Sequence, residues 1–411
     1  MIFLNSLARH GDATLFMAKE DGVKSLYVYG SGEAYDAPDG EVIALPGGNV
    51  KRCPLTNQNA RVLRGLFPFT RPVSHKGRAF TLGLGDRLGL ASAGHIRLIR
   101  DRDVFPVLAQ QSIRELNLTG RTYDDVLSAA VWAVFQEGYR KGYSADGDHL
   151  KTREEVKMAL DCGFTMITLD CSEHIPNGLA AVVRFAVDIY NEFIRGKDID
   201  FELSVDETHV TTSPEDHYFV ARELKKAGVE LVSLAPRFCG EFQKGIDYRG
   251  DVREFEKEFA VHAGIAKEMG YKLSIHSGSD KYAVFPIIYR ETGRNVHIKT
   301  AGTNWLEALR VLARVTPGLF RKIHTLALES LPEAKKYYHI TEDVSRIPAL
   351  DTLSDAELPA LLEQDDARQA LHVTYGQVLA AYKAPIYAAL GQYEDEYRAA
   401  LGLNIGRHLG D

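Results

Sequence analysis

Histidines and carboxylates recur at the ends of short apolar runs in this 411-residue chain. His149, Asp206, His276 and His339 lie at or near such ends, as does His209. Imidazole nitrogens and carboxylate oxygens together suit a divalent metal ion, although each histidine taken alone could equally cap a loop or bond a neighbouring acid. The set therefore predicts a metal site with His149, Asp206, His276 and His339 as ligands. It leaves open whether the ion is Zn, Mn, Ni or Co.

Acids and cations accompany these histidines. The candidate proton carriers are Asp146, Glu173 and Glu207. The candidate anchors for an anionic substrate are Arg87, Lys151, Arg237 and Lys299. The acids could instead cap helices or be solvated, and the cations could pair with those same acids. Lys299 has a second interpretation, as a lysine that forms a Schiff base.

Eight apolar runs precede these polar clusters, and long, well-capped amphipathic segments separate most of them. Thr152 and Glu155 form a capping box before one such segment, and Gly163 ends it. This alternation predicts an α/β protein, and eight strands favour a closed (β/α)8 barrel over a doubly wound sheet. The predicted strands are Phe80–Leu84, Gly142–Ala145, Phe164–Asp170, Phe201–Asp206, Val229–Leu234, Lys272–His276, Val296–Lys299 and Lys336–Ile340.

The position of each side chain within its strand indicates where it points. In the strand Phe201–Asp206 the apolar side chains take one face, and Glu202, Ser204 and Asp206 take the other. Apolar faces should meet the surrounding helices, so the polar faces should look into the barrel. Asp206 and Glu207 point to opposite faces of a regular strand, so only one of them should reach a metal directly unless a bulge intervenes.

The chain divides into three predicted parts: a β-rich N-terminal unit over residues 1–70, the barrel over 71–345, and a helical extension over 346–411. The net charge is −7 and the basic residues are scattered, which argues against a nucleic-acid partner. No apolar run approaches the length of a membrane span, and none of the four cysteines lies in a CxxC pair. We expect a cytoplasmic protein with reduced thiols, and the sequence leaves open whether it forms a homo-oligomer.

Seven motifs, in order, resemble the tagaturonate epimerase family. They are GLGDRLGLASAGH, ADGDHLK, LDCSEH, SVDETH, LAPRF followed by GEFQKGIDYRGD, SIHSGSDK, and ALHVTYG around His372. The resemblance covers about Phe80 to Gly376 and implies a barrel fold, a divalent metal and a keto-hexuronate substrate. It implies an isomerase that interconverts D-tagaturonate and D-fructuronate in hexuronate breakdown.

These two sugar acids differ at a carbon two positions from the ketone, where simple enolisation cannot invert the centre. Retro-aldol cleavage, rotation of the aldehyde and re-addition is a workable route that needs an acid/base, a Lewis acid and a cationic clamp. Transient oxidation by nicotinamide is the chemical rival, but Gly83–Gly89 does not fit the GxGxxG fingerprint. Two other functions stay open: a Schiff-base or metal-dependent aldolase or lyase acting on a sugar acid, and a non-catalytic sugar-acid-binding barrel.

Overall fold

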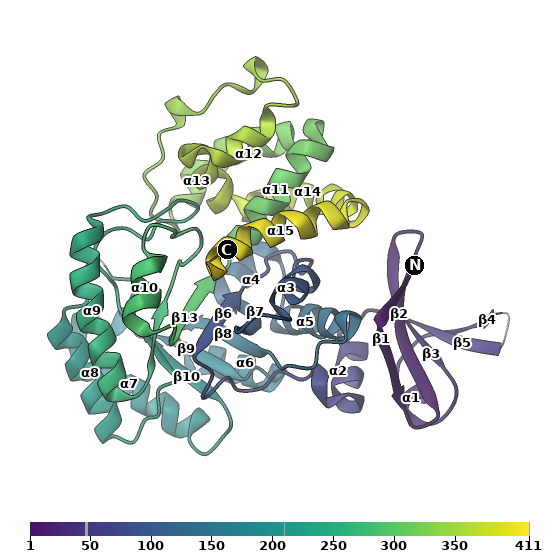
Figure 1. The fold of residues 1–411 in the computed structure, drawn as a ribbon, viewed down its shortest axis with the longest axis horizontal. Helices are drawn as coiled ribbons and strands as arrows, with labels where there is room; N and C mark the ends of the chain where they lie inside the picture. The colour runs from purple at the N-terminus through teal and green to yellow at the C-terminus, as the bar shows by residue number, and fades with distance from the viewer. Residues whose placement is uncertain (46–47, 209, 411) are drawn as a thin grey trace.

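Parallel strands closed into a barrel form the centre of the protein (Figure 1). The structure, a computed structural model, describes residues 1–45, 48–208 and 210–410, so His209 lies outside the described residues. The barrel strands are β6 (Phe80–Leu84), β7 (Phe105–Ser112), β8 (Ser144–Leu150), β9 (Met166–Asp170), β10 (Asp200–Ser204), β11 (Ser233–Ala235), β12 (Lys272–Ile275) and β13 (Val296–Thr300). The last strand pairs with the first, from Val296 against Phe80 to Thr300 against Leu84. The predicted (β/α)8 barrel is confirmed.

Seven of the eight predicted strands overlap an observed strand, and Lys336–Ile340 was wrong. That segment follows α12 (Pro317–Ala334) as irregular chain. The barrel has already closed through β13 and β6, which leaves no sheet edge for a further strand.

The strand that sequence reasoning missed is β7. It carries Pro106, which cannot donate a backbone hydrogen bond, and its apolar run ends in the polar pair Gln110 and Gln111. These features weaken the local strand signal. Pairing with both neighbouring strands overrides them, and seven of the eight residues of β7 are buried.

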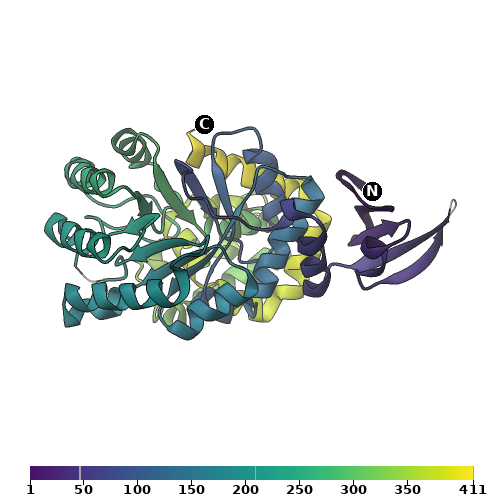
Figure 2. The same ribbon diagram turned by 90° about the horizontal axis from the view of Figure 1, so that it is seen from below.

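Helices cover the outside of the barrel, as Figure 2 shows from below. They are α3 (Ser92–Ile99), α4 (Ile113–Thr119), α5 (Tyr123–Glu137), α6 (Arg153–Cys162), α7 (Leu179–Ile189), α8 (Pro214–Lys226), α9 (Val252–Met269) and α10 (Phe285–Thr292). The predicted end signals hold: Thr152 and Glu155 form the capping box of α6, and Gly163 ends it with a φ of 95°. None of the described helices is long and apolar enough to cross a membrane.

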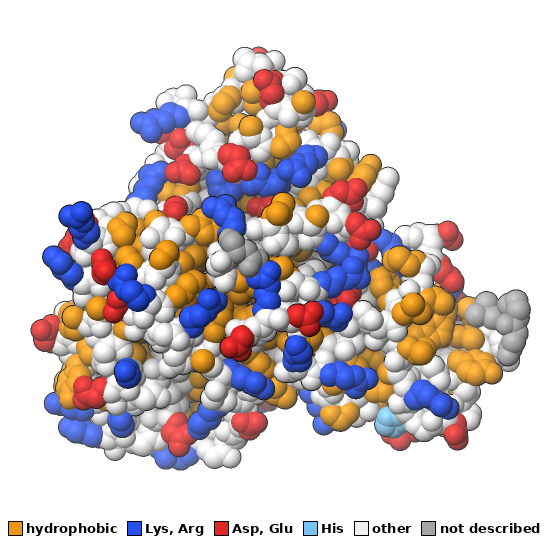
Figure 3. Space-filling model, in the orientation of Figure 1, with side chains coloured by type: hydrophobic (Ala, Val, Ile, Leu, Met, Phe, Trp, Pro, Cys, Tyr) orange, Lys and Arg blue, Asp and Glu red, His pale blue; other side chains and the backbone are white. Residues whose placement is uncertain are grey.

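An antiparallel sheet forms the N-terminal unit and projects to one side of the barrel (Figures 1 and 2). Its order is β1-β2-β3-β5-β4, with β1 (Ile2–His10), β2 (Ala13–Glu20), β3 (Val23–Tyr29), β4 (Glu41–Leu45) and β5 (Gly48–Pro54). The helices α1 (Glu33–Asp36) and α2 (Asn57–Leu66) belong to the same region. Hydrophobic side chains cover part of this unit in Figure 3, and Ile2, Leu4 and Leu7 of β1 are exposed.

After β13 the chain is helical, with a second hydrophobic core of its own. Its helices are α11 (Thr303–Val315), α12, α13 (Asp365–Val373), α14 (Tyr375–Gln392) and α15 (Glu394–Leu409). The buried Trp305 of α11 donates a hydrogen bond to the backbone oxygen of Leu371 in α13. The predicted helical C-terminal part is therefore present, and it packs against the barrel rather than extending from it (Figure 1). The division at residues 70 and 345 stays a prediction.

Candidate active site

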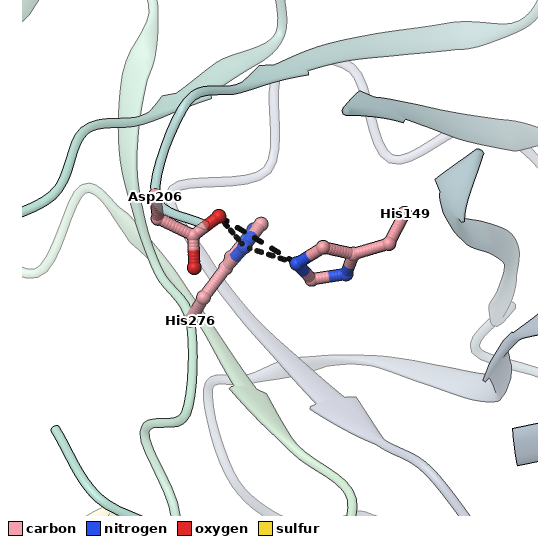
Figure 4. A group of neighbouring side chains, drawn as sticks. All are labelled: His149, Asp206 and His276. Carbon is pink, nitrogen blue, oxygen red and sulfur yellow. Dashed lines mark hydrogen bonds and ion pairs between the residues drawn. The ribbon is translucent and has the colours of Figure 1, made fainter. Parts of the chain in front are cut away.

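Two imidazole nitrogens and one carboxylate oxygen converge at the mouth of the barrel (Figure 4). His276 Nδ1 lies 3.0 Å from Asp206 Oδ1 and 3.1 Å from His149 Nε2, and the last two atoms are 3.5 Å apart. The three residues come from different strands: His149 is the last residue but one of β8, Asp206 comes shortly after β10, and His276 directly follows β12. We call them the triad.

Neighbouring acids orient both histidines of the triad. Asp148 Oδ1 lies 2.8 Å from His149 Nδ1, and Glu202 Oε1 lies 2.7 Å from His276 Nε2. Each ring is thereby held with its other nitrogen toward the centre of the triad, the arrangement that fixes metal-binding histidines. His149 also has a positive φ of 52°, next to an irregularity in the pairing of β8 with β9. Such a conformation is costly for a residue with a side chain and is typical of functional sites.

The spacing of the triad fits a divalent metal. Donor atoms about 2.1 Å from one ion lie about 3.0 Å apart in octahedral geometry and about 3.4 Å apart in tetrahedral geometry. The observed separations of 3.0, 3.1 and 3.5 Å fall in this range. Two histidines and one carboxylate are also a common donor set for Zn, Mn, Ni or Co. Burial favours the neutral acid of Asp206, but His276 and His149 outweigh it and hold its pKa well below the usual value.

Lys299 lies beneath the triad at the centre of a buried ionic network. Its Nζ is 2.8 Å from Asp146 Oδ2, 2.7 Å from Asp148 Oδ1 and 2.9 Å from Glu202 Oε1. Burial disfavours the charged amine, but these three carboxylates outweigh it and hold the Lys299 pKa well above its usual value. The ammonium therefore offsets part of the negative charge of Asp148 and Glu202, the acids that support His149 and His276.

Glu207 follows Asp206 and faces the same cavity. Arg114, from α4, donates to both of its carboxylate oxygens, at 2.8 and 3.1 Å. Burial raises the pKa of Glu207, but His149 and Arg114 outweigh this and bring it below the usual value. Of the adjacent pair, only Asp206 belongs to the triad, but both residues line the cavity, because β10 ends at Ser204 and strand alternation does not extend to residues 206 and 207.

The triad opens into a cavity of about 300 Å³. Eight of the eleven predicted site residues line it: Arg87, His149, Asp206, Glu207, Arg237, His276, Lys299 and His339. His339 lies after α12 rather than on a strand, is exposed, and is not part of the triad. The other three residues line no part of the cavity: Asp146 is buried against Lys299, while Lys151 and Glu173 pair with each other at 2.8 Å.

Sequence reasoning did not name several residues that line the cavity as site residues: Gln110, Ser112, Arg114, Glu115, Lys244, Lys281, Tyr338 and His372. The first four of these belong to the missed strand β7 and to the helix α4 that follows it. One sequence signal was available, because Ser112 and Glu115 form a capping box that marks the start of α4 and so the end of β7. Lys244 and His372 stand in two of the motifs that resemble the tagaturonate epimerase family, but no strand alternation or capping pattern marks them. They reach the cavity from a loop and from the C-terminal helices.

A closed parallel barrel with acids, imidazoles and cations gathered at its carboxyl-terminal mouth defines a (β/α)8-barrel enzyme. Comparison with known proteins narrows this class to an isomerase of the epimerase type. The chain belongs to the tagaturonate epimerase family, whose model matches residues 3–182 and 179–411.

Relatives of known structure and sequence align with nearly the whole chain. The tagaturonate/fructuronate epimerase of Thermotoga maritima is 38% identical, over 99% of this chain and 96% of that protein. The glycerol-bound crystal structure of the fructuronate-tagaturonate epimerase of Cohnella laeviribosi has a TM-score of 0.96 at 44% identity, over 99% of this chain and 95% of its own. The native crystal structure of that enzyme also has a TM-score of 0.96.

Proposed function

We propose that this protein interconverts D-tagaturonate and D-fructuronate, and that it does so with a divalent metal held by His149, Asp206 and His276. The convergence of the triad beside Glu207, in a cavity of about 300 Å³, is the observation that carries the proposal. Membership of the tagaturonate epimerase family supports the choice of substrate.

The reaction must invert a hydroxyl-bearing carbon that the ketone does not acidify, because a further carbon stands between them. Cleavage of the bond between that intervening carbon and the inverted one gives an aldehyde and an enediolate. Rotation of the aldehyde and re-formation of the same bond on its other face gives the epimer, with no net change in atoms or electrons. When bound, a divalent metal supplies Lewis-acid stabilisation of the negative charge that develops on the enediolate oxygens.

Residues of the chain supply the remaining functions. Glu207 is ionised and partly exposed in the cavity, so it can accept the hydroxyl proton during cleavage and return it during re-addition. Arg114 holds that carboxylate by both oxygens and fixes its position. Asp146 and Glu173 are weaker candidates because neither lines the cavity.

A Schiff-base aldolase through Lys299 is the less favoured alternative. A Schiff base forms from a neutral amine, and enzymes that use one lower the pKa of the lysine. Here three carboxylates surround Lys299 Nζ and raise its pKa instead. A non-catalytic sugar-acid-binding barrel has no support from the family.

One incubation tests the proposal. Purified protein with D-tagaturonate should give D-fructuronate in the NMR spectrum, a chelator should stop the conversion, and added Zn, Mn, Ni or Co should restore it. Full activity in metal-free protein would refute the role of the metal, and absence of the epimer in metal-loaded protein would refute the function.

A further inference from the structure

The predicted substrate anchors already have partners. Arg87 pairs with Glu115 at 2.9 Å, and Lys299 is surrounded by three carboxylates. Lys151 pairs with Glu173 outside the cavity, and Arg237 donates to the backbone oxygen of Thr208. A substrate carboxylate would have to compete with these contacts.

Lys244 differs from all four. It lies between β11 and α9, lines the cavity, and donates to Ser277 Oγ at 2.8 Å. Among the described residues, no carboxylate oxygen lies within 4.0 Å of its Nζ. An ammonium group has three N–H donors, so two remain for a ligand.

His372 supplies a second group without a partner. Its side chain comes from α13, is 1% exposed and lines the same cavity, yet Nδ1 has no hydrogen-bond partner in the part of the chain that the structure describes. Polar atoms this deeply buried are nearly always hydrogen-bonded, and because the residue lines the cavity, its unpaired imidazole is free to orient toward a ligand there. Burial, together with Arg87 and Lys244, holds the pKa of His372 well below its usual value, so the ring is neutral and one nitrogen can donate.

Basic side chains gather around His372, and burial lowers the pKa of Lys244 and brings that of Lys281 to about 7. Arg87, Lys244, Arg368 and Lys281 all act on its ring. Glu115 balances Arg87, and Asp280 balances Arg368 at 2.8 Å. Lys281 donates to the backbone oxygens of Gln243, Ile246 and Ser279, which carry no net charge. An anion is the ligand that this part of the cavity would stabilise.

The hydrogen bond from Lys244 to Ser277 places Lys244 close to the triad. Ser277, the partner of Lys244, directly follows His276. A six-carbon sugar acid could therefore present its ketone end to the triad and its carboxylate to Lys244.

We propose that Lys244 and His372 form the subsite that binds the substrate carboxylate and makes the enzyme selective for uronates over neutral ketohexoses. This inference rests on the proposed function, since it assigns one end of that substrate. It also gives the subsite a mechanistic purpose. After cleavage the aldehyde fragment carries the carboxylate, and a fixed carboxylate lets the aldehyde carbon rotate without loss of the fragment.

The test compares D-tagaturonate with D-tagatose, which has a hydroxymethyl group in place of the carboxylate. Lys244→Met keeps an unbranched side chain of nearly the same length and removes the charge. It should raise the KM for tagaturonate roughly 10- to 150-fold, the loss of one charge-assisted hydrogen bond, and change kcat little. The Ki of tagatose as a competitive ligand should stay within about twofold, because uncharged groups do not need the ammonium.

Three further variants sharpen the test. Lys244→Arg keeps the charge and should recover most of the uronate affinity. His372→Phe keeps a ring against its neighbours and should raise the uronate KM by roughly 10- to 150-fold, as expected for one hydrogen bond to a charged acceptor. Lys225→Met, an exposed lysine of α8 that donates to the backbone oxygen of Met269, is the matched control and should change neither constant.

An unchanged KM for tagaturonate in Lys244→Met would overturn the inference, as would an equal loss of affinity for tagatose. The rise in Tm that each ligand causes measures binding without turnover, so it distinguishes failure of the carboxylate subsite from failure of the proposed function. Wild-type protein that is protected by tagaturonate without epimerising it, together with loss of that protection in Lys244→Met, would keep the subsite and refute the activity.

Discussion

The imidazole of His372 packs directly on Gly302, so closely that a Cβ at residue 302 would lie 1.6 Å from Nε2. Gly302 follows β13 and precedes α11, whereas His372 belongs to α13. Because Gly302 has no side chain, the imidazole ring of His372 can occupy its place in the cavity wall.

Gly302→Ala should displace His372 from the cavity. We expect a rise in the KM for tagaturonate of the same size as in His372→Phe, and a loss of stability of about 1–3 kcal/mol from overpacking. Gly264→Ala is the control, because Gly264 lies in α9 where an added Cβ would meet nothing within 4 Å, and alanine favours the helix. Wild-type affinity in Gly302→Ala would show that the contact does not position His372.

His276→Ala should remove one ligand of the triad and with it most of the bound metal. Metal content by mass spectrometry should fall, and turnover should drop by roughly 100-fold or more, the upper range seen when a metal site is disturbed. His339→Ala should keep its metal, because His339 lies outside the triad. Loss of the metal in His339→Ala would instead show that His339 is a metal ligand, as predicted from the sequence.

Glu207→Gln should lower kcat by roughly 100- to 10,000-fold, the usual contribution of a general acid/base, with the metal retained. The amide keeps the shape of the side chain but cannot accept the proton. Glu173→Gln is the matched control, because that carboxylate is exposed and lines no part of the cavity. Equal losses in the two variants, measured by NMR of the epimerisation, would contradict the assignment.

Lys299→Met should destabilise the fold by about 3–5 kcal/mol, because it leaves Asp146, Asp148 and Glu202 buried without their cation. Denaturant unfolding measures this loss. In wild-type protein, borohydride treatment with substrate should leave Lys299 unmodified, since the residue is held as an ammonium ion. A covalent adduct on Lys299 in the mass spectrum would instead favour the Schiff-base alternative.

His324 should make the stability depend on pH. Burial in α12 lowers its pKa to about 4, and neither ring nitrogen has a hydrogen-bond partner within residues 1–45, 48–208 and 210–410. The unfolded chain binds this proton near pH 6.5 and the folded chain only near pH 4, so stability is complete above 6.5 and falls as the pH drops between those values. The loss at pH 5 is about 2 kcal/mol. His324→Leu should remove that loss and raise stability at neutral pH, and an unchanged pH profile of unfolding would contradict this.

Local pattern predicted much of the barrel and part of the site. Alternation along the predicted strand Phe201–Asp206 placed Glu202 and Asp206 on the inward face, and the Glu202 contact with His276 confirms that orientation for Glu202. The rule put Glu207 on the opposite face, yet Glu207 lines the cavity, because the observed strand ends at Ser204. Local pattern also failed at β7, where Pro106 weakens the signal, and at Lys336–Ile340, where a strand-like run meets a barrel that is already closed.

The sequence by itself determined the strand alternation, the helix ends and the inward face of each predicted strand, because these depend on neighbours within a few residues. Only the tertiary structure decided which groups meet. It brought His149 against His276 across 127 residues and paired Lys299 with three acids. Among the residues that the structure describes, it placed no carboxylate in an ion pair with Lys244, and it brought His372 from the C-terminal helices to the mouth of the barrel. Charge pairing acts through space, and no local periodicity records which partner a side chain reaches once the barrel has closed.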